Sequence, residues 1–296
     1  MIIPLLACVL FGAIPGIFAQ DDFSVAPWLS LSASARVDFH NVYGTFFNPR
    51  LSALIRKNGW TSRVSAGQGF YAATPLTEET EAAGLERLLL PVPLRAERGR
   101  SASADLTRSM GPVSVTATFF ASNIDHPVYV DRGATYEIMN LHGPTRNRGL
   151  ELLATWRKSP FTATASYTYV RASELEPTGR AEVPLTPRHS LGIVGMWEKE
   201  GVTRIGLECY YTGTQRLEYN PYRDLSAPYV LVGTMAEQKI AAHVKLFLNL
   251  ENLTNVRQTH WDPLLLPARA SDGRWTVDAW APLEGRIVNG GARFWF

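Results

Sequence analysis

The chain has 296 residues and a formal net charge of +2, with 46% hydrophobic and 11% aromatic residues. A net charge this close to zero gives no indication of a basic surface of the kind that binds nucleic acid. The mean hydropathy is -0.07, and beyond the N-terminus no run approaches the ~20 apolar residues that a spanning helix needs, which excludes a conventional helical membrane protein.

The N-terminal segment, residues 1–15, is apolar. It could belong to a secretory signal that ends before Gln20. However, no Lys or Arg occurs before Arg36, whereas a signal peptide carries a positive region at its start. Pro4 and Pro15 also interrupt the run. These observations leave two alternatives open: the segment is cleaved as a signal, or it is retained in the protein.

From residue 16 onward, short segments alternate between apolar and polar residues and are bounded by turn residues. In 28–39, for example, Leu29, Leu31 and Ala33 share one face, and serines occupy the other. This period of two predicts β-strands. The same alternation occurs in segments 113–121, 150–156, 161–169, 244–250 and 288–296.

The polar faces of these strands carry charged and amide side chains that a dry core could not hold without partners. They include Arg36, Asp38, Arg63, Lys245 and Asn249. The opposite faces are rich in Leu, Val, Ala and aromatic residues over many strands. A wet lumen on one side and lipid on the other explain both faces, as in a transmembrane β-barrel.

The connections between the predicted strands alternate between short and long. Short turns are expected at 26–27, 58–59, 111–112, 159–160, 200–201 and 241–242. Long segments are expected at 40–45, 70–94, 124–144, 172–184, 216–227 and 254–284. This alternation is typical of outer-membrane barrels, which have tight periplasmic turns and long outer loops, and it argues against a soluble sandwich.

The C-terminal segment ends on Phe296. Val288, Gly290, Ala292 and Phe294 alternate with more polar residues up to that end. A last strand with one apolar face and a terminal aromatic residue resembles the closing strand of bacterial outer-membrane barrels.

Several strings resemble the barrel of TonB-dependent receptors. They are YGTFFNPRLSALIR (43–56), GQGFYAATPLTEETEAAGLERL (67–88), MNLHGPTRNRGLELLATW (139–156), TPRHSLGIVGMW (186–197), FLNLENLTNVRQT (247–259) and APLEGRIVNGGARFWF (281–296). The resemblance extends from about residue 16 to 296. The expected fold is an all-β, antiparallel transmembrane β-barrel, partial, with about thirteen strands.

The resemblance also concerns what lies outside the barrel. The family carries an N-terminal plug domain inside a barrel of about 22 strands, and no segment of this chain resembles a plug or a TonB box. The sequence alone therefore gives no ground for coupling to TonB. By the resemblance, 17–23 is a strand and Ala26-Pro27 a periplasmic turn, so cleavage after Ala19 would cut a strand. This favours the interpretation that the chain is the C-terminal portion of a longer receptor.

No catalytic or metal-binding motif is present. The sequence lacks a GxSxG elbow, a P-loop and a dinucleotide fingerprint, so an enzyme is not expected. The two cysteines, Cys8 and Cys209, are predicted to be unpaired thiols. Neither a metal site nor a cofactor is predicted, because the histidines are scattered without ligand spacing: His40, His126, His142, His189, His243 and His260.

Ligand capture is expected in the outer loops and the upper lumen. Aromatic residues and arginine suit stacking on, and pairing with, a large anionic or aromatic ligand. The alternative is that the aromatic residues form an interfacial girdle. Arg286 is expected to be a lumenal ion-pair partner. The candidate ligand residues are Tyr71, Tyr219, Tyr222, Arg223, His260 and Trp261.

The function implied by the resemblance is an outer-membrane receptor or transporter in a Gram-negative-type bacterium. It would take up a scarce large solute, such as a metal chelate, a vitamin or an oligosaccharide. Its partners would be outer-membrane lipid and an unidentified small-molecule ligand, with no nucleic acid. The alternatives are an outer-membrane scaffold that does not transport and a passive pore.

Overall fold

The computed structural model describes residues 14–74, 88–176, 179–271 and 273–295. Cys8, Phe296 and the apolar segment up to residue 13 lie outside the described residues. Within them, no helix is long and apolar enough to cross a membrane.

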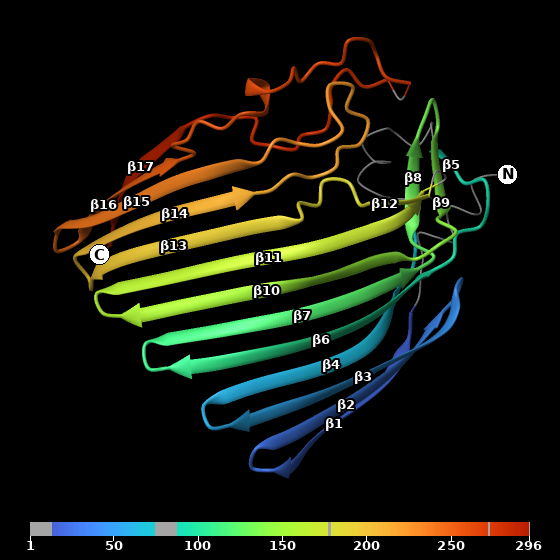
Figure 1. The fold of residues 1–296 in the computed structure, drawn as a ribbon, viewed down its shortest axis with the longest axis horizontal. Coiled ribbons are helices and arrows are strands. Elements are labelled where there is room, and N and C mark those ends of the chain that lie inside the picture. The colour runs from blue at the N-terminus through green and yellow to red at the C-terminus, as the bar shows by residue number, and fades with distance from the viewer. Residues whose placement is uncertain (1–13, 75–87, 177–178, 272, 296) are drawn as a thin grey trace.

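Thirteen strands form one curved antiparallel sheet in which almost every strand pairs with the next along the chain (Figure 1). Its path contains β1 (Gly16–Ala26), β2 (Leu29–His40), β3 (Gly44–Lys57), β4 (Trp60–Tyr71), β6 (Glu97–Met110), β7 (Val113–Asp125), β10 (Thr145–Lys158), β11 (Phe161–Glu176), β13 (His189–Lys199), β14 (Thr203–Thr212), β15 (Tyr229–Ala241), β16 (Val244–Glu251) and β17 (Ile287–Phe294). A further strand, β12 (Gly179–Glu182), pairs with β11. The predicted strand segments are confirmed, except that the last strand ends at Phe294 rather than running to the final residue, which lies outside the described residues.

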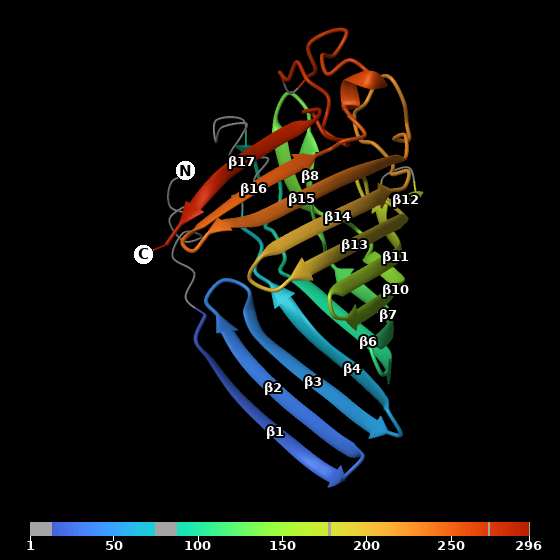
Figure 2. The ribbon, with the colours of Figure 1, turned by 90° about the vertical axis from the view of Figure 1, so that its left-hand side faces the viewer.

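The two end strands of this path, β1 and β17, each pair with one neighbour among the described residues. Figure 2 shows the sheet from the side, where β1 to β4 turn away from β13 to β17. The architecture is therefore a partial barrel, as expected.

The two faces of the sheet differ as the alternation predicts. Leu51, Phe119 and Leu207 leave 63%, 58% and 58% of their surface exposed. Only ten hydrophobic residues in the described part are buried. A water-soluble domain does not expose large apolar residues on this scale, so this face requires an apolar environment.

The polar face carries charged groups in pairs. Asp38, which is 3% exposed, accepts hydrogen bonds from Arg36 Nε at 2.6 Å and from Asn48 Nδ2 at 3.0 Å. Lys245 Nζ donates to Glu237 at 2.8 Å. These pairs confirm that Arg36, Asp38 and Lys245 belong to a polar face.

The short turns lie at one end of the strands and the longer connections at the other (Figure 1). The expectation of a long connection at 40–45 was wrong, because β2 ends at His40 and β3 begins at Gly44. His40 Nδ1 accepts hydrogen bonds from the backbone N–H groups of Val42 and Tyr43, at 3.0 and 3.2 Å. This side chain closes a tight turn that the strand pattern does not reveal.

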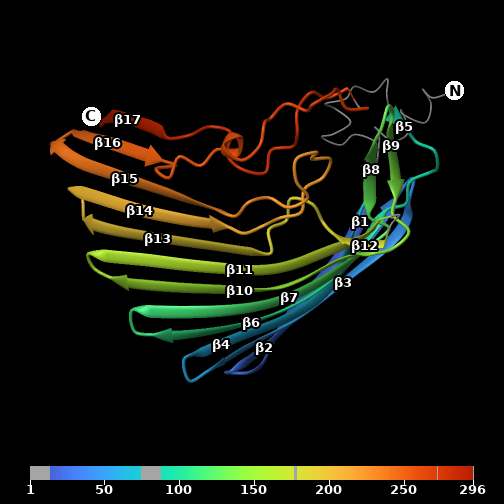
Figure 3. The same ribbon diagram turned by 45° about the horizontal axis from the view of Figure 1, so that its top comes forward.

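The long connection 124–144 contains structure that the sequence pattern did not show. Within it, β8 (Val128–Arg132) and β9 (Tyr136–Asn140) form a hairpin, and β5 (Leu88–Leu89) pairs with β9 in parallel. Ile138 is fully buried in this small sheet. The hairpin stands at the end of the large sheet where the long connections gather (Figure 3).

Candidate ligand-binding site

Three long connections meet beyond the ends of β14, β15 and β16. They are 213–228, 252–286 and the β8–β9 hairpin. Tyr222 Oη donates to the carbonyl oxygen of Leu265, which joins the first two. Arg132 of β8 lies 4.0 Å from a carboxylate oxygen of Glu218 and 3.5 Å from one of Asp278. Arg132 therefore links the hairpin to both other connections.

An aromatic cluster fills the space between 213–228 and 252–286. Trp280 is 4% exposed. Its ring centroid lies 5.2 Å from that of Trp261, and the Arg223 guanidinium lies 5.6 Å from the centroid of the Trp280 ring. Tyr229 and Leu217 pack on the same cluster. Packing of this kind gives the loops a small core of their own.

Two buried amides hold the backbone of this core. Gln258, on the 3-10 helix η2 (Gln258–His260), is fully buried, and its Oε1 accepts from the backbone N–H groups of Trp280 and Ala281 at 2.8 and 3.3 Å. Gln215 Nε2 donates to the carbonyl oxygen of Trp280 at 2.9 Å. Because a buried backbone group without a partner is costly, these amides fix the position of Trp280.

A pocket of about 580 Å³ opens beside this core. Arg132, Arg223 and Arg274 bring positive charge to its wall, and Tyr219 adds an aromatic ring. Each guanidinium lies near a carboxylate. Arg223 donates to Asp262 at 2.8 Å, Arg274 donates to Asp278 at 2.8 Å, and Arg132 has the longer contacts given above. Arg132 is thus the arginine of this pocket held least tightly by carboxylates.

Burial in these loops raises two pKa values. The pKa of Glu218 lies above its usual value, since burial outweighs the opposing effect of Arg132. Burial also raises the pKa of Tyr129, helped by a hydrogen bond with Tyr219. Tyr129 therefore remains protonated at neutral pH and can act as a hydrogen-bond donor.

Five of the six residues predicted to bind ligand lie on two of the three connections, and two of them, Tyr219 and Arg223, line the pocket. Tyr219, Tyr222 and Arg223 lie on 213–228, while His260 and Trp261 lie on 252–286. His260 is exposed at the end of η2.

The sixth, Tyr71, lies apart at the end of β4, next to Tyr43 of the β2–β3 turn. The role of all six in ligand binding stays a prediction.

The sequence reasoning missed the contribution of the β8–β9 hairpin, which brings Arg132 to the pocket wall and Tyr129 next to Tyr219. Alternation in VYVDR and YEIMN, flanking Gly133, was the available signal. It also missed Trp280, which the chain places 57 positions after Arg223 (280 − 223).

The expectation for Arg286 was wrong in its partner, because Arg286 Nε donates to the carbonyl oxygen of Leu253 at 2.9 Å and forms no ion pair within the described residues.

No group of three or more His, Cys, Asp or Glu residues in the described part of the chain could hold a metal ion. Cys209 lies on β14 as a free thiol. The pocket wall offers three guanidinium groups and the phenol of Tyr219.

Residues 12–253 match the family model described as TonB dependent receptor-like, beta-barrel. The chain belongs to this family. The predicted resemblance and the predicted fold class, a partial antiparallel transmembrane β-barrel, are thereby confirmed. No curated protein matches the chain.

Solved structures of TonB-dependent receptors have the same fold. A G324V mutant of the ferric enterobactin receptor from Pseudomonas aeruginosa matches with a TM-score of 0.75 and 17% identity, over 96% of this chain and 45% of that one. The FrpB iron transporter of Neisseria meningitidis matches with a TM-score of 0.71 and 14% identity, over 96% and 45%. The ferric-catecholate import receptor Fiu of E. coli K12 matches at 0.68 and 13%, over 96% and 44%. The chain spans less than half the length of these receptors.

Proposed function

We propose that this TonB-dependent receptor barrel lies in the outer membrane of a Gram-negative-type bacterium and serves the uptake of a scarce, anionic metal chelate. The similar structures are described as receptors for ferric enterobactin and ferric catecholates and as an iron transporter. These structures share only 13–17% sequence identity with the chain, so they support its fold and not its ligand. The proposed class of ligand therefore rests on the pocket of this chain.

The observation that carries the proposal is the pocket between the three long connections. Its guanidinium groups suit an anionic chelate, because charge-assisted hydrogen bonds are the strongest available there. The phenol of Tyr219 on its wall can stack on a catecholate ring and donate a hydrogen bond to it. Arg132 is the first contact to expect, since its two carboxylate partners are distant enough for a ligand anion to compete.

The test is ligand binding by the chain refolded in detergent. Ferric enterobactin serves as the probe and iron-free enterobactin as its control, with tryptophan fluorescence as the readout. Arg132→Gln and Tyr219→Ala should each weaken binding of the ferric probe by about tenfold, which corresponds to the loss of one good contact. Tyr71→Ala is the matched control, because this tyrosine lies outside the cluster. If Tyr71→Ala weakened binding of the ferric probe as much as the two pocket variants do, the pocket would not be the binding site.

The alternative functions predict different results in the same preparation. A passive pore would conduct ions across a planar bilayer without ligand. A scaffold that does not transport would fold but would neither conduct nor bind the chelate.

A further inference from the structure

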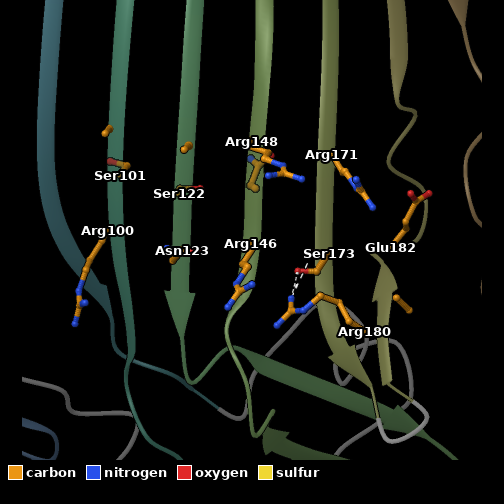
Figure 4. A pocket seen from close by; sticks show the side chains of 14 residues that line it. Arg100, Ser101, Ser122, Asn123, Arg146, Arg148, Arg171, Ser173, Arg180 and Glu182 are labelled. Carbon is orange, nitrogen blue, oxygen red and sulfur yellow. Dashed lines mark hydrogen bonds between the residues drawn. The ribbon is translucent and has the colours of Figure 1, made fainter.

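A second pocket, of about 650 Å³, lies across the outer ends of β6, β7, β10 and β11 and reaches β12. Figure 4 shows its side chains in rows across neighbouring strands. Its most prominent feature is positive charge, contributed by Arg100, Arg146, Arg148, Arg171 and Arg180. None of these residues belongs to the pocket between the long connections.

The register of the sheet places these arginines on its apolar face. Arg148 pairs with Ala121 of β7 and with Arg171 of β11, so the three side chains point the same way. Two positions along β10, Leu150 pairs with Phe119 and Tyr169. Since residues two apart on a strand share a face, the arginines continue the row of Leu, Phe and Tyr side chains instead of facing the lumen.

The arginines also lie at a defined height on that face. On β10, the apolar stripe runs from Trp156 to Leu150, and Arg148 and Arg146 follow it at the end near the long connections. The apolar band of an outer-membrane barrel is bounded at both edges by aromatic residues. Tyr169 and Phe119 therefore mark the outer boundary, and the arginines lie directly beyond it.

The protein neutralises little of the positive charge of this row, since in the described part of the chain only Arg100 lies near a carboxylate, 3.6 Å from an oxygen of Asp125. Arg148 and Arg171 are direct cross-strand neighbours, a pairing of like charges that is unfavourable in a sheet. Among the described residues, no carboxylate forms an ion pair with Arg146, Arg148 or Arg171. Glu182, the carboxylate in the pocket lining, pairs with Arg188. An external anion would relieve this repulsion.

We propose that this arginine row binds the phosphate groups of a phosphorylated glycolipid in the outer leaflet of the membrane. The inference rests on the proposed membrane location, and it is independent of the transported solute. A guanidinium pairs with phosphate through two parallel hydrogen bonds. The row faces lipid at the level where the headgroups begin, so a lipid phosphate reaches it with its acyl chains beside Leu150 and Tyr169.

The test compares phosphorylated lipopolysaccharide with the same lipid after enzymatic removal of its phosphates. The chain is refolded in detergent, and binding is measured by titration with fluorescent lipid. The test variant carries Arg146→Gln, Arg148→Gln and Arg171→Gln. The matched control carries Arg56→Gln, Arg157→Gln and Lys158→Gln, which removes the same charge from exposed residues near the short turns.

The arginine variant should bind phosphorylated lipopolysaccharide about tenfold or more weakly, and the control variant as tightly as the unchanged chain. Removing the phosphates from the lipid should produce the same loss without any mutation. Inorganic pyrophosphate should compete only weakly, because it lacks the acyl chains. Equal affinity for both lipids, or full competition by pyrophosphate, would overturn the proposal of a glycolipid site.

Retained ferric enterobactin binding in the arginine variant would show that the fold and the first pocket are intact. If the triple variant does not fold, Arg171→Gln alone should still weaken lipid binding, and unchanged binding there would contradict the proposal. Failure of the membrane location itself would appear separately, as recovery of the protein in a soluble cell fraction.

Discussion

Gly149 of β10 lies so close to Tyr169 of β11 that a Cβ atom on the glycine would overlap the tyrosine carbonyl oxygen. The same Cβ would meet the ring of Phe120 from the other side, at 2.5 Å. Backbone on one side and an aromatic ring on the other leave no room for a side chain. This glycine is therefore required for the close approach of β10 to both neighbours.

Gly149→Ala should weaken pairing at the centre of the sheet. The expected result is a lower refolding yield and loss of heat-modifiable mobility on a gel at a lower temperature than for the unchanged chain. Gly195→Ala is the control, because a Cβ at Gly195 on β13 would meet nothing within 4 Å. Equal behaviour of the two variants would contradict the crowding at Gly149.

Trp280→Ala should loosen the long connections and leave the sheet in place. Removing a buried tryptophan costs about 3 kcal/mol or more, and Trp280 is the centre of the loop core. Limited proteolysis should therefore cut 252–286 faster in this variant. Trp275→Ala serves as the control, because Trp275 lies on the same connection and is 56% exposed. The prediction fails if the two variants are cut at the same rate.

The raised pKa of Glu218 predicts that the loop cluster is more stable at mildly acidic pH. The unfolded value is 4.5, and the folded value lies above it. Below pH 4.5 Glu218 is protonated in both states, and its contribution is fully present. As pH rises through the folded pKa, the buried carboxyl ionises at a cost and that contribution is lost. Hydrogen exchange in 213–228 should accelerate over this window.

Glu218→Gln should remove this acceleration, because glutamine does not titrate. The matched control is Glu284→Gln, an exposed position on 252–286. An unchanged pH dependence in the Glu218 variant would assign the effect to another group.

The strands could be predicted from sequence because lipid and lumen impose opposite demands on alternate residues. In 150–156 and 244–250 the apolar stripe alone gives the strand and its face. The turn at His40 could not be predicted in this way, since it depends on one side chain accepting hydrogen bonds from the backbone.

The sites were harder to predict than the strands. Tyr219 and Arg223 stand out as aromatic and charged residues within one loop, and they do line one pocket. The contact of Arg223 with Trp280, and the pocket that Tyr219 and Arg223 share with Arg132, depend on how three connections fold together, which no local pattern encodes. The arginine row depends on the register of several strands, because Arg148 and Arg171 become neighbours only when β10 and β11 pair.

The central claim is that the sheet spans the outer membrane with the pocket between the long connections outside the cell. A membrane-impermeant maleimide tests it in intact cells that produce the protein with Cys8 and Cys209 replaced by serine. A cysteine at Ser271, on the pocket wall, should be labelled in intact cells. A cysteine at Glu200, in the β13–β14 turn, should react only after the outer membrane is permeabilised. Equal labelling of both positions in intact cells, or labelling of Glu200→Cys alone, would contradict the account.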